Sequence, residues 1–254
     1  MPRGFRRLRL DQLLHERGLF PSREQARRAV MAGLVSVAGR RVDKPGTAVK
    51  DDAELLVAAP AEPFVSRAGR KLAAALDEFG VDPTGAVALD VGASTGGFTH
   101  CLLERGARRV YAVDVGYGQL DVRLRDDPRV VVMDRINARH LAPDALPEPC
   151  DLITLDVSFI SLAKVMPALE PHLARPDGRI LALVKPQFEA GRGVVGKGGI
   201  VRDEAVRRRV IDEAVARLVA LGLELLGVID SAVPGSGGNR EAFALFSWPR
   251  KEPS

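Results

Sequence analysis

The sequence predicts an α/β protein whose main part is a doubly wound, mostly parallel seven-stranded sheet, preceded by a small α+β module at the N-terminus. From residue 86 onward, short apolar runs alternate with helical patterns, which is typical of strands covered by helices on both faces. Several runs end in one ionisable residue, at the sheet edge where α/β proteins bind ligands. Residues 1–58 hold 12 Lys/Arg against 7 Asp/Glu, whereas the other 196 residues hold 25 against 26. The N-terminal module is therefore expected to be a separate, basic unit with a polyanionic partner.

The composition excludes several classes of protein. The 254 residues are 28% charged and 46% hydrophobic, as in ordinary soluble domains. No apolar run approaches the ~18 residues that span a bilayer, and the basic first residues lead into no signal-like apolar stretch. We therefore expect a cytoplasmic protein without a membrane partner. Cys101 and Cys150 are isolated and the four histidines are scattered, so neither a disulfide framework nor a metal site is expected.

The N-terminal module, residues 1–58, combines two helices with short strands. Its expected elements are helices over 10–17 and 22–31, a hairpin over 35–42 and a strand over 55–57. Ser22 and Gln25 fit a capping box that opens the second helix. On that helix Arg23, Arg27 and Arg28 crowd one side, where like charges are costly unless an anion faces them. The phosphate backbone of a nucleic acid is such an anion.

The main part is predicted to span residues 65–254, after a stiff, proline-bearing linker over 59–64. Its expected elements are, in order, a helix over 66–79, a strand over 86–91, a helix from the glycine-rich turn to residue 105, strands over 110–114, 130–134, 152–155 and 180–184, a helix over 204–221, and strands over 225–229 and 241–248. Short turns between alternating elements imply parallel strands. The last strand is expected to run antiparallel beside 180–184.

A glycine-rich turn after the first of these strands indicates the cofactor. In this turn Ser94 stands where dinucleotide-binding proteins have their second glycine, so the backbone cannot approach a pyrophosphate closely. The pattern Asp-Val-Gly-x-x-x-Gly-Gly is similar to that of methyltransferases that use S-adenosylmethionine. In such an arrangement Asp114 accepts from both ribose hydroxyls, and Asp134, one strand further, receives the adenine amino group. The residues predicted to bind S-adenosylmethionine are Asp90, Gly92, Ser94, Thr95, Gly96, Gly97, Phe98, Asp114 and Asp134.

Asp156 and Lys185 end two successive strands and form either a structural ion pair or a proton-transfer site. Methylation of an amino group commonly uses an Asn/Asp-Pro-Pro-aromatic turn, but this turn reads Asp156-Val157-Ser158-Phe159. Methylation of cytosine C5 needs a cysteine nucleophile at this edge, and Cys150 precedes its strand, at the opposite end. A ribose 2′-hydroxyl needs only removal of a weakly acidic proton, for which a lysine is suited.

Two resemblances extend these predictions. Residues 9–49 resemble the S4 RNA-binding domain on the runs Arg9-Leu10-Asp11, Ser22-Arg23, Ala26-Arg27, Gly33 to Val37 and Lys44-Pro45. The topology is expected to bring Lys71, Asp156, Lys185 and Glu241 to one edge, and their order resembles the Lys-Asp-Lys-Glu tetrad of FtsJ-type RNA ribose 2′-O-methyltransferases. From about Arg9 to Phe246 the chain is similar to the TlyA family, an S4 domain fused to an FtsJ-like methyltransferase, whose members act on ribosomal RNA and are also labelled haemolysins.

The resemblance implies a role for each site residue. Lys185 would be nearest the 2′-oxygen, as general base or as the charge that stabilises the forming alkoxide; Asp156 would orient it, and Lys71 and Glu241 would complete the network. The residues implied to contact RNA are Arg9, Arg23, Arg27, Arg28 and Lys44. The implied substrate is a cytidine ribose of 23S rRNA in the ribosomal subunit, with 16S rRNA as an additional target.

Two departures from the family pattern bear on these roles. Asp134-Arg135-Ile136-Asn137 stands where Glu-Arg-Thr-Asn is expected, which weakens the adenine contact of Asp134. The longer tail of members that modify both subunits does not follow the last strand, which favours the large-subunit target. Two other functions stay open: a non-catalytic RNA-binding or ribosome-associated factor, against which the complete tetrad speaks, and a membrane-active haemolysin, which no strongly amphipathic basic helix supports.

Overall fold

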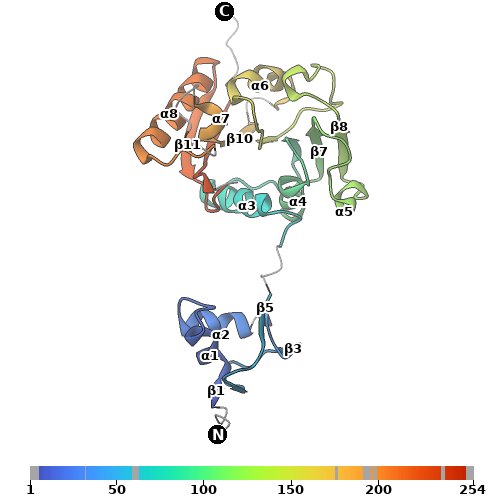
Figure 1. Cartoon of the computed structure of the whole chain (residues 1–254). Coiled ribbons are helices and arrows are strands. Elements are labelled where there is room, and N and C mark those ends of the chain that lie inside the picture. The colour runs from blue at the N-terminus through green and yellow to red at the C-terminus, as the bar shows by residue number, and fades with distance from the viewer. Residues whose placement is uncertain are drawn as a thin grey trace, which may run out of the picture. The chain divides into compact units, whose positions relative to one another are not determined.

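The structure of the chain is a computed structural model that describes residues 6–31, 33–58, 63–174, 177–190, 196, 199–235 and 238–249. The chain divides into two compact units, Met1–Ala61 and Glu62–Ser254, each with its own hydrophobic core (Figure 1). Residues 59–62 of the predicted linker lie outside the described residues.

The N-terminal unit contains two short helices and two small sheets. Its elements are β1 (Arg7–Arg9), α1 (Leu10–Glu16), α2 (Arg23–Met31), β2 (Val35–Val37), β3 (Arg40–Val42), β4 (Ala48–Lys50) and β5 (Leu55–Val57). β1 pairs with β4, and β2 lies between β3 and β5, all antiparallel. Leu10, Leu14, Val30 and Val35 are fully buried in its core. The predicted helices and hairpin are present, whereas β1 and β4 are too short to show a periodic pattern in the sequence.

The C-terminal unit is built on one seven-stranded sheet. Its elements are α3 (Arg67–Phe79), β6 (Val87–Val91), α4 (Gly97–Glu104), β7 (Arg109–Asp114), α5 (Val122–Arg125), β8 (Val130–Asp134), η1 (Ala138–His140), β9 (Leu152–Leu155), α6 (Leu162–Leu169), η2 (Glu170–His172), β10 (Arg179–Val184), α7 (Pro186–Glu189), α8 (Glu204–Ala220), β11 (Glu224–Asp230) and β12 (Ala242–Ser247). The strand order is β11-β12-β10-β9-β6-β7-β8. Because β12 alone runs opposite to the other six strands of this sheet, the predicted doubly wound, mostly parallel sheet is confirmed.

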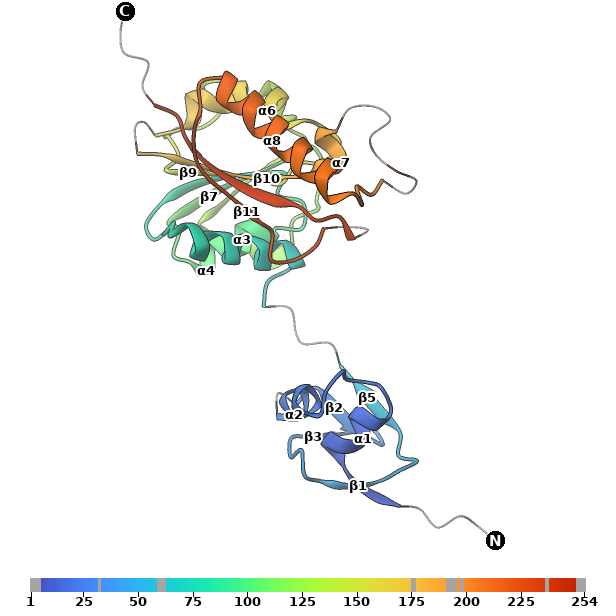
Figure 2. The ribbon, with the colours of Figure 1, turned by 90° about the vertical axis from the view of Figure 1, so that its left-hand side faces the viewer.

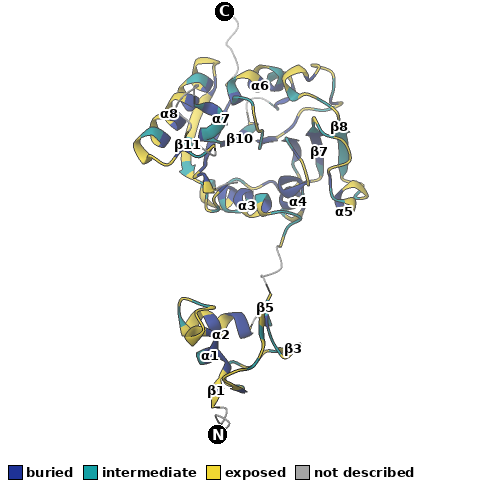
Figure 3. Ribbon diagram, in the orientation of Figure 1, coloured by how far each residue is buried: buried dark blue, intermediate teal, exposed yellow. Residues whose placement is uncertain are grey.

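Helices cover both faces of this sheet, as the sequence pattern predicted. Figure 2 shows α3 and α4 on one side of the sheet and α6, α7 and α8 on the other. Leu72 and Leu102 pack in the core of the first side, and Val165, Met166 and Ile211 pack in the core of the second. The central strands are buried, whereas β11 at the edge is partly exposed (Figure 3).

The strand register brings the predicted catalytic residues to one edge. Val184 of β10 pairs with Ala242 of the antiparallel β12, so the residues just beyond them, Lys185 and Glu241, share that edge. Asp156 follows β9, which runs parallel to β10 as its neighbour. The carboxyl ends of parallel strands form the ligand-binding edge of such sheets. The topology therefore places these three charges where chemistry is expected.

Candidate active site and nucleic-acid interface

Lys185 and Asp156 form a close ion pair at the carboxyl edge of the sheet. Lys185 Nζ lies 2.6 Å from Asp156 Oδ1 and also donates to Ser158 Oγ at 2.9 Å. The Lys185 and Asp156 side chains are 11% and 18% exposed, so the pair is shielded but still reachable. Pro186 follows directly and favours the extended backbone that Lys185 adopts at the start of α7. Ser158 is a partner of this pair that no strand-end pattern reveals.

Lys71 and Glu241 form a second ion pair. Lys71 Nζ, from α3, donates to Glu241 Oε2 at 2.6 Å, and the Glu241 side chain is only 2% exposed. The loop before β12 packs onto this carboxylate so closely that a Cβ added at Gly235 would overlap it. The four predicted catalytic residues are thus arranged as two ion pairs, one just beyond the ends of β9 and β10 and one between α3 and the residue that precedes β12.

A cavity of about 370 Å³ opens at the same edge and is large enough for a small-molecule cofactor. Its lining includes Gly92, Ser94 and Asp114 from the ends of β6 and β7, together with Asp156 and Phe159 from the end of β9. The cavity therefore joins three of the predicted cofactor residues to the Lys185–Asp156 pair.

Asp114 organises the cofactor side of this cavity. Its Oδ2 accepts from the Ser94 amide at 2.8 Å, and its Oδ1 accepts from the Gly116 amide at 2.7 Å. Gly92 has a φ of +86°, and a Cβ added there would lie 2.7 Å from the Asp156 carbonyl oxygen, so this position requires glycine. A carboxylate has about four acceptor sites, so Asp114 retains capacity for two ribose hydroxyls. These residues fit the nucleoside part of S-adenosylmethionine.

Replacing Asp114 is expected to weaken cofactor binding strongly. Asp114→Ala removes the ribose acceptor and also releases the two amides that shape the turn, so the S-adenosylmethionine Kd should rise about 10- to 100-fold. Titration calorimetry measures the change. Asp127→Ala is the control, because its carboxylate binds Arg129 near the opposite end of the sheet. Equal affinities for wild type and Asp114→Ala would contradict the role of Asp114.

Most of the glycine-rich turn supports the cavity without lining it. In the described part of the chain, the predicted cofactor residues outside the lining are Asp90, Thr95, Gly96, Gly97, Phe98 and Asp134. A Cβ at Gly96 would overlap Leu124, and one at Gly97 would overlap Ser66, so both glycines allow close packing around the start of α4. Phe98 is buried in the core, 6.0 Å from the ring of Phe243.

Asp134 is turned toward the segment between β7 and β8. Its carboxylate accepts from the Gly118 amide at 2.9 Å and pairs with Arg125 at 3.6 Å. The cavity is lined instead by Ile136 and Asn137, which follow it in the chain. These two residues are candidates for the adenine side that sequence reasoning missed. The departure from the family pattern in this segment was the signal that could have indicated them.

Asp90 lies beneath the cavity, with no exposed surface. Thr99 Oγ1 donates to its Oδ2 at 2.7 Å, and Thr154 Oγ1 donates to its Oδ1 at 3.2 Å. Burial nevertheless raises the pKa of Asp90 to about 7; the Thr99 hydrogen bond opposes this, and the nearby Asp156 charge adds to it. Asp90 is therefore a buried support of the site whose charge changes near neutral pH.

The raised pKa of Asp90 predicts a specific pH dependence of stability. Between about pH 4 and 7 the folded state holds a proton that the unfolded state has lost, so this contribution is present at low pH and lost as pH rises through 7. Asp90→Asn cannot ionise and should lack this loss, gaining roughly 3 kcal/mol relative to wild type between pH 5 and 8. Thermal unfolding across this range measures the difference. Wild-type and variant curves that stay parallel would contradict it.

An aromatic pair, of which one ring is exposed and the other half-buried, borders the Lys185–Asp156 pair. Phe159 is 90% exposed and has a φ of +64°, a left-handed conformation that is strained for a bulky residue. Its ring lies 4.9 Å from that of Phe188, which follows Lys185 by three residues. An aromatic ring exposed to this extent beside a polar site is a surface on which a planar group can stack.

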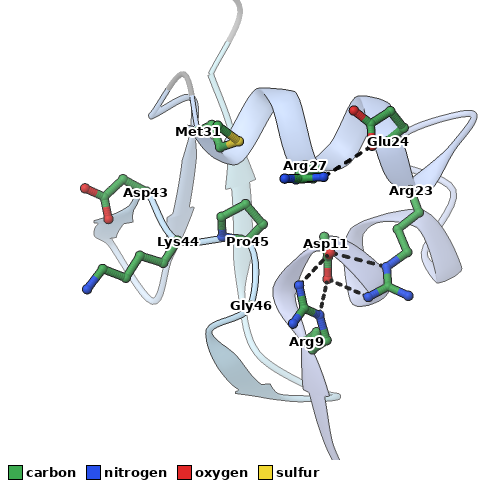
Figure 4. Close-up of a pocket in the computed structure, with 10 residues that line it drawn as sticks. All are labelled: Arg9, Asp11, Arg23, Glu24, Arg27, Met31, Asp43, Lys44, Pro45 and Gly46. Atoms are coloured by element: carbon green, nitrogen blue, oxygen red, sulfur yellow. Dashed lines mark hydrogen bonds and ion pairs between the residues drawn. The ribbon is translucent and has the colours of Figure 1, made fainter.

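The N-terminal unit gathers four of the five predicted RNA-binding residues around one hollow of about 710 Å³ (Figure 4). Arg9, Arg23, Arg27 and Lys44 line it. Arg28 lies outside this lining in the described structure; its side chain is 76% exposed and pairs with Glu24 at 3.5 Å. The structure thus separates Arg28 from the other basic residues of the predicted set.

Asp11 holds two of these arginines in place. Its carboxylate, 4% exposed, lies 3.1 Å from Arg9 Nε and 3.2 Å from Arg23 Nε, as Figure 4 shows. Burial opposes its ionisation, but the hydrogen bonds from Arg9 and Arg23 outweigh burial and keep the pKa of Asp11 below its ordinary value. The two guanidinium groups remain about half exposed. They are therefore fixed in orientation and still available to an anion.

A doubly wound sheet with a cavity at its carboxyl edge, next to a shielded Lys–Asp pair, together with the match to a methyltransferase family model, makes the chain a class I S-adenosylmethionine-dependent methyltransferase. The family model of FtsJ-like methyltransferases matches residues 64–247, and that of the S4 domain matches residues 8–55. The chain belongs to the TlyA family, in which an S4 domain precedes an FtsJ-like methyltransferase domain.

Relatives and solved structures agree with this family. The chain is 49% identical to the 16S/23S rRNA (cytidine-2′-O)-methyltransferase TlyA of Mycobacterium tuberculosis, over 97% of this chain and 91% of that protein. It is 40% identical to Hemolysin A of Brachyspira hyodysenteriae, over 94% and 99%. It resembles the structure titled "Putative hemolysin from Streptococcus thermophilus" with a TM-score of 0.73 and 42% identity, over 96% of this chain and 90% of that one.

The described residues contain neither a candidate membrane-spanning helix nor a candidate metal site. None of the described helices is both long and apolar enough to cross a bilayer. In the same part of the chain, His, Cys, Asp and Glu side chains form no group of three or more that could hold a metal ion.

Proposed function

We propose that this protein transfers the methyl group of S-adenosylmethionine to the 2′-hydroxyl of a cytidine in ribosomal RNA, with 23S rRNA as the main target and 16S rRNA as a second one. The observation that carries the proposal is the Lys185–Asp156 pair at 2.6 Å, on the edge of the cofactor cavity. A hydroxyl that attacks a methyl group needs a group that accepts its proton or stabilises the negative charge on its oxygen, and this pair supplies such a group. The M. tuberculosis relative bears the name of this reaction.

The residues of the site divide the work of the reaction. When bound, S-adenosylmethionine would supply an electrophilic methyl group on its sulfonium; the ribose oxygen would take this methyl group, and S-adenosylhomocysteine would leave as a neutral thioether. Lys185 donates one N–H to Ser158 Oγ and forms an ion pair with Asp156, so another N–H of its ammonium can face the ribose oxygen. As a neutral amine, Lys185 would accept the hydroxyl proton; as an ammonium, it would instead stabilise the developing oxyanion while the hydroxyl proton leaves to solvent. Phe159 and Phe188 offer an apolar surface to the base of the same nucleotide.

The S4 domain would supply most of the affinity for RNA. Arg9, Arg23, Arg27 and Lys44 line one hollow together with the carboxylates Asp11, Glu24 and Asp43, and exposed cations of this kind bind phosphates without reading sequence. We infer that this surface docks the ribosomal subunit and that the methyltransferase domain selects the nucleotide. The protein would then act in the cytoplasm, where its substrate is found.

Incubating purified ribosomal subunits with the protein and labelled S-adenosylmethionine tests the proposal. The expected product carries the label on the 2′-oxygen of a cytidine, which mass mapping of nucleosides and resistance to alkaline cleavage identify. Label on a base nitrogen or on C5 would show that the protein methylates a base, which would contradict the proposed ribose methylation. RNA binding without any transfer would instead support the non-catalytic factor.

A further inference from the structure

Glu189 is a buried carboxylate just outside the proposed catalytic pair. It is the last residue of α7, the single helical turn that begins directly after Lys185. Its side chain is 2% exposed. A buried carboxylate is costly unless hydrogen bonds compensate it, so its contacts indicate what it stabilises.

These contacts reach across to the segment that follows β9. Glu189 Oε1 accepts from the Leu162 amide at 2.7 Å, and Oε2 accepts from Ser161 Oγ at 2.8 Å. Leu162 is the first residue of α6 and Ser161 is its N-cap. A serine in that position usually caps its own helix, but here its hydroxyl donates to Glu189 and makes no side-chain cap. The α6 N-terminus is thus capped by a residue that follows a different strand.

Arg217 of α8 completes the arrangement from the outer side. Its Nη2 donates to Glu189 Oε2 at 2.9 Å, and its side chain is 41% exposed. The Arg217 guanidinium compensates the carboxylate charge while remaining partly in water. Glu189 therefore links α6, α7 and α8, which lie on the same side of the sheet (Figure 2).

The link joins the two segments that carry the reacting groups. Residues 156–161 run without regular structure from β9 to α6 and carry Asp156, Ser158 and Phe159. Residues 185–189 carry Lys185 and Phe188. Backbone pairing of β9 with β10 fixes both segments at one end, and Glu189 fixes them at the other. The Lys185 contacts with Asp156 and Ser158 lie between these two attachments.

We propose that Glu189 is a positioning residue for methyl transfer: by capping α6 it holds the 156–161 segment at the distance from Lys185 that the reaction requires. The inference rests on the proposed function. Without the cap, the segment could move while the sheet and the cofactor turn stay intact. A misplacement of about 1 Å at a reacting group can cost about 100-fold in rate.

Glu189→Met and Glu189→Gln form a matched pair of tests. Both side chains are uncharged and similar in size to Glu, but only Gln keeps an oxygen for the Leu162 amide and an amide group for Ser161. We expect Glu189→Met to lower kcat about 10- to 100-fold, with the KM and Kd for S-adenosylmethionine within about twofold of wild type. Glu189→Gln should restore kcat to within about threefold.

Hydrogen exchange of the free protein supplies a second readout that needs no RNA. The Leu162 amide and its neighbours should exchange faster in Glu189→Met than in wild type, and Glu189→Gln should restore protection. Asp151→Asn is the structural control. It weakens the hydrogen bond of 2.9 Å that the Val87 amide donates to the Asp151 carboxylate at the opposite edge of the sheet. It should leave kcat and this exchange unchanged.

Several outcomes would overturn the inference. Wild-type kcat in Glu189→Met would show that the cap does not matter for the reaction. Equal losses of kcat in the Met and Gln variants would assign the effect to charge. A parallel loss of cofactor affinity in Glu189→Met would show general unfolding. If wild type itself transfers no methyl group, the proposed function fails, and unchanged exchange at Leu162 would separately refute the cap.

Discussion

Lys185→Met is expected to abolish methyl transfer to ribosomal RNA while leaving the protein folded and able to bind S-adenosylmethionine. The substitution keeps an unbranched side chain only one atom shorter than lysine, which is 11% exposed, but removes the ammonium that lies 2.6 Å from Asp156. Loss of the group that accepts the hydroxyl proton or stabilises the oxyanion should lower kcat about 10³-fold. Single-turnover transfer of a labelled methyl group measures the rate, and calorimetry measures cofactor affinity.

The matched control is Lys164→Met, which makes the same change at an exposed position on α6. Its kcat should equal that of wild type. Lys185→Met with normal cofactor and RNA affinity and an unchanged kcat would sink the catalytic assignment. Residual activity that rises steeply with pH would instead show hydroxide replacing Lys185 as the base.

Arg27→Glu combined with Lys44→Glu is expected to weaken binding to ribosomal RNA about 100-fold at physiological salt. Both residues line the hollow of the S4 domain, and neither forms the Asp11 ion pairs, so the domain should stay folded. Each lost phosphate contact removes a released counterion. The slope of log K against log salt should therefore become shallower by about 1.5 to 2. Filter binding over a range of salt concentrations measures both quantities.

Arg28→Glu combined with Arg40→Glu introduces the same charge change outside this hollow. Both side chains are exposed and belong to the same domain, but neither is part of the hollow's lining. This control should lose only a small, salt-dependent part of the affinity. Equal losses in the two double variants would show that net charge, and not this surface, binds RNA.

Much of the fold could be predicted because its signals are local. The strand from Leu152 to Leu155 is apolar except for Thr154, and α3 shows an apolar stripe with Gly80 in the left-handed conformation at its end. Strand order, by contrast, depends on the direction in which each crossover connection runs, and no local sequence pattern gives that direction. The antiparallel β12 could be inferred only from its place at the end of an alternating pattern.

The candidate site divides in the same way. Lys185 and Asp156 could be paired in advance, because the ends of successive parallel strands meet at one edge. The cap from Glu189 could not, since it joins an amide and a carboxylate that are 27 residues apart and lie on different helices. Asp134 shows the limit of motif reasoning, because its predicted adenine contact competes with the Gly118 amide that the structure places beside it.

By itself the sequence determined which residue types stand at the strand ends, where the glycine-rich turn lies, and that a basic module precedes the sheet. Periodicity, turn chemistry and charge act over a few residues, so they can be read directly from the chain. Three findings came only from the folded structure: Lys71, expected at the same edge as Glu241, pairs with it directly, Asp90 is buried beneath the cavity, and Asp11 orients two arginines. Such contacts arise when separate elements pack and exclude water, and packing of this kind leaves no local trace in the sequence.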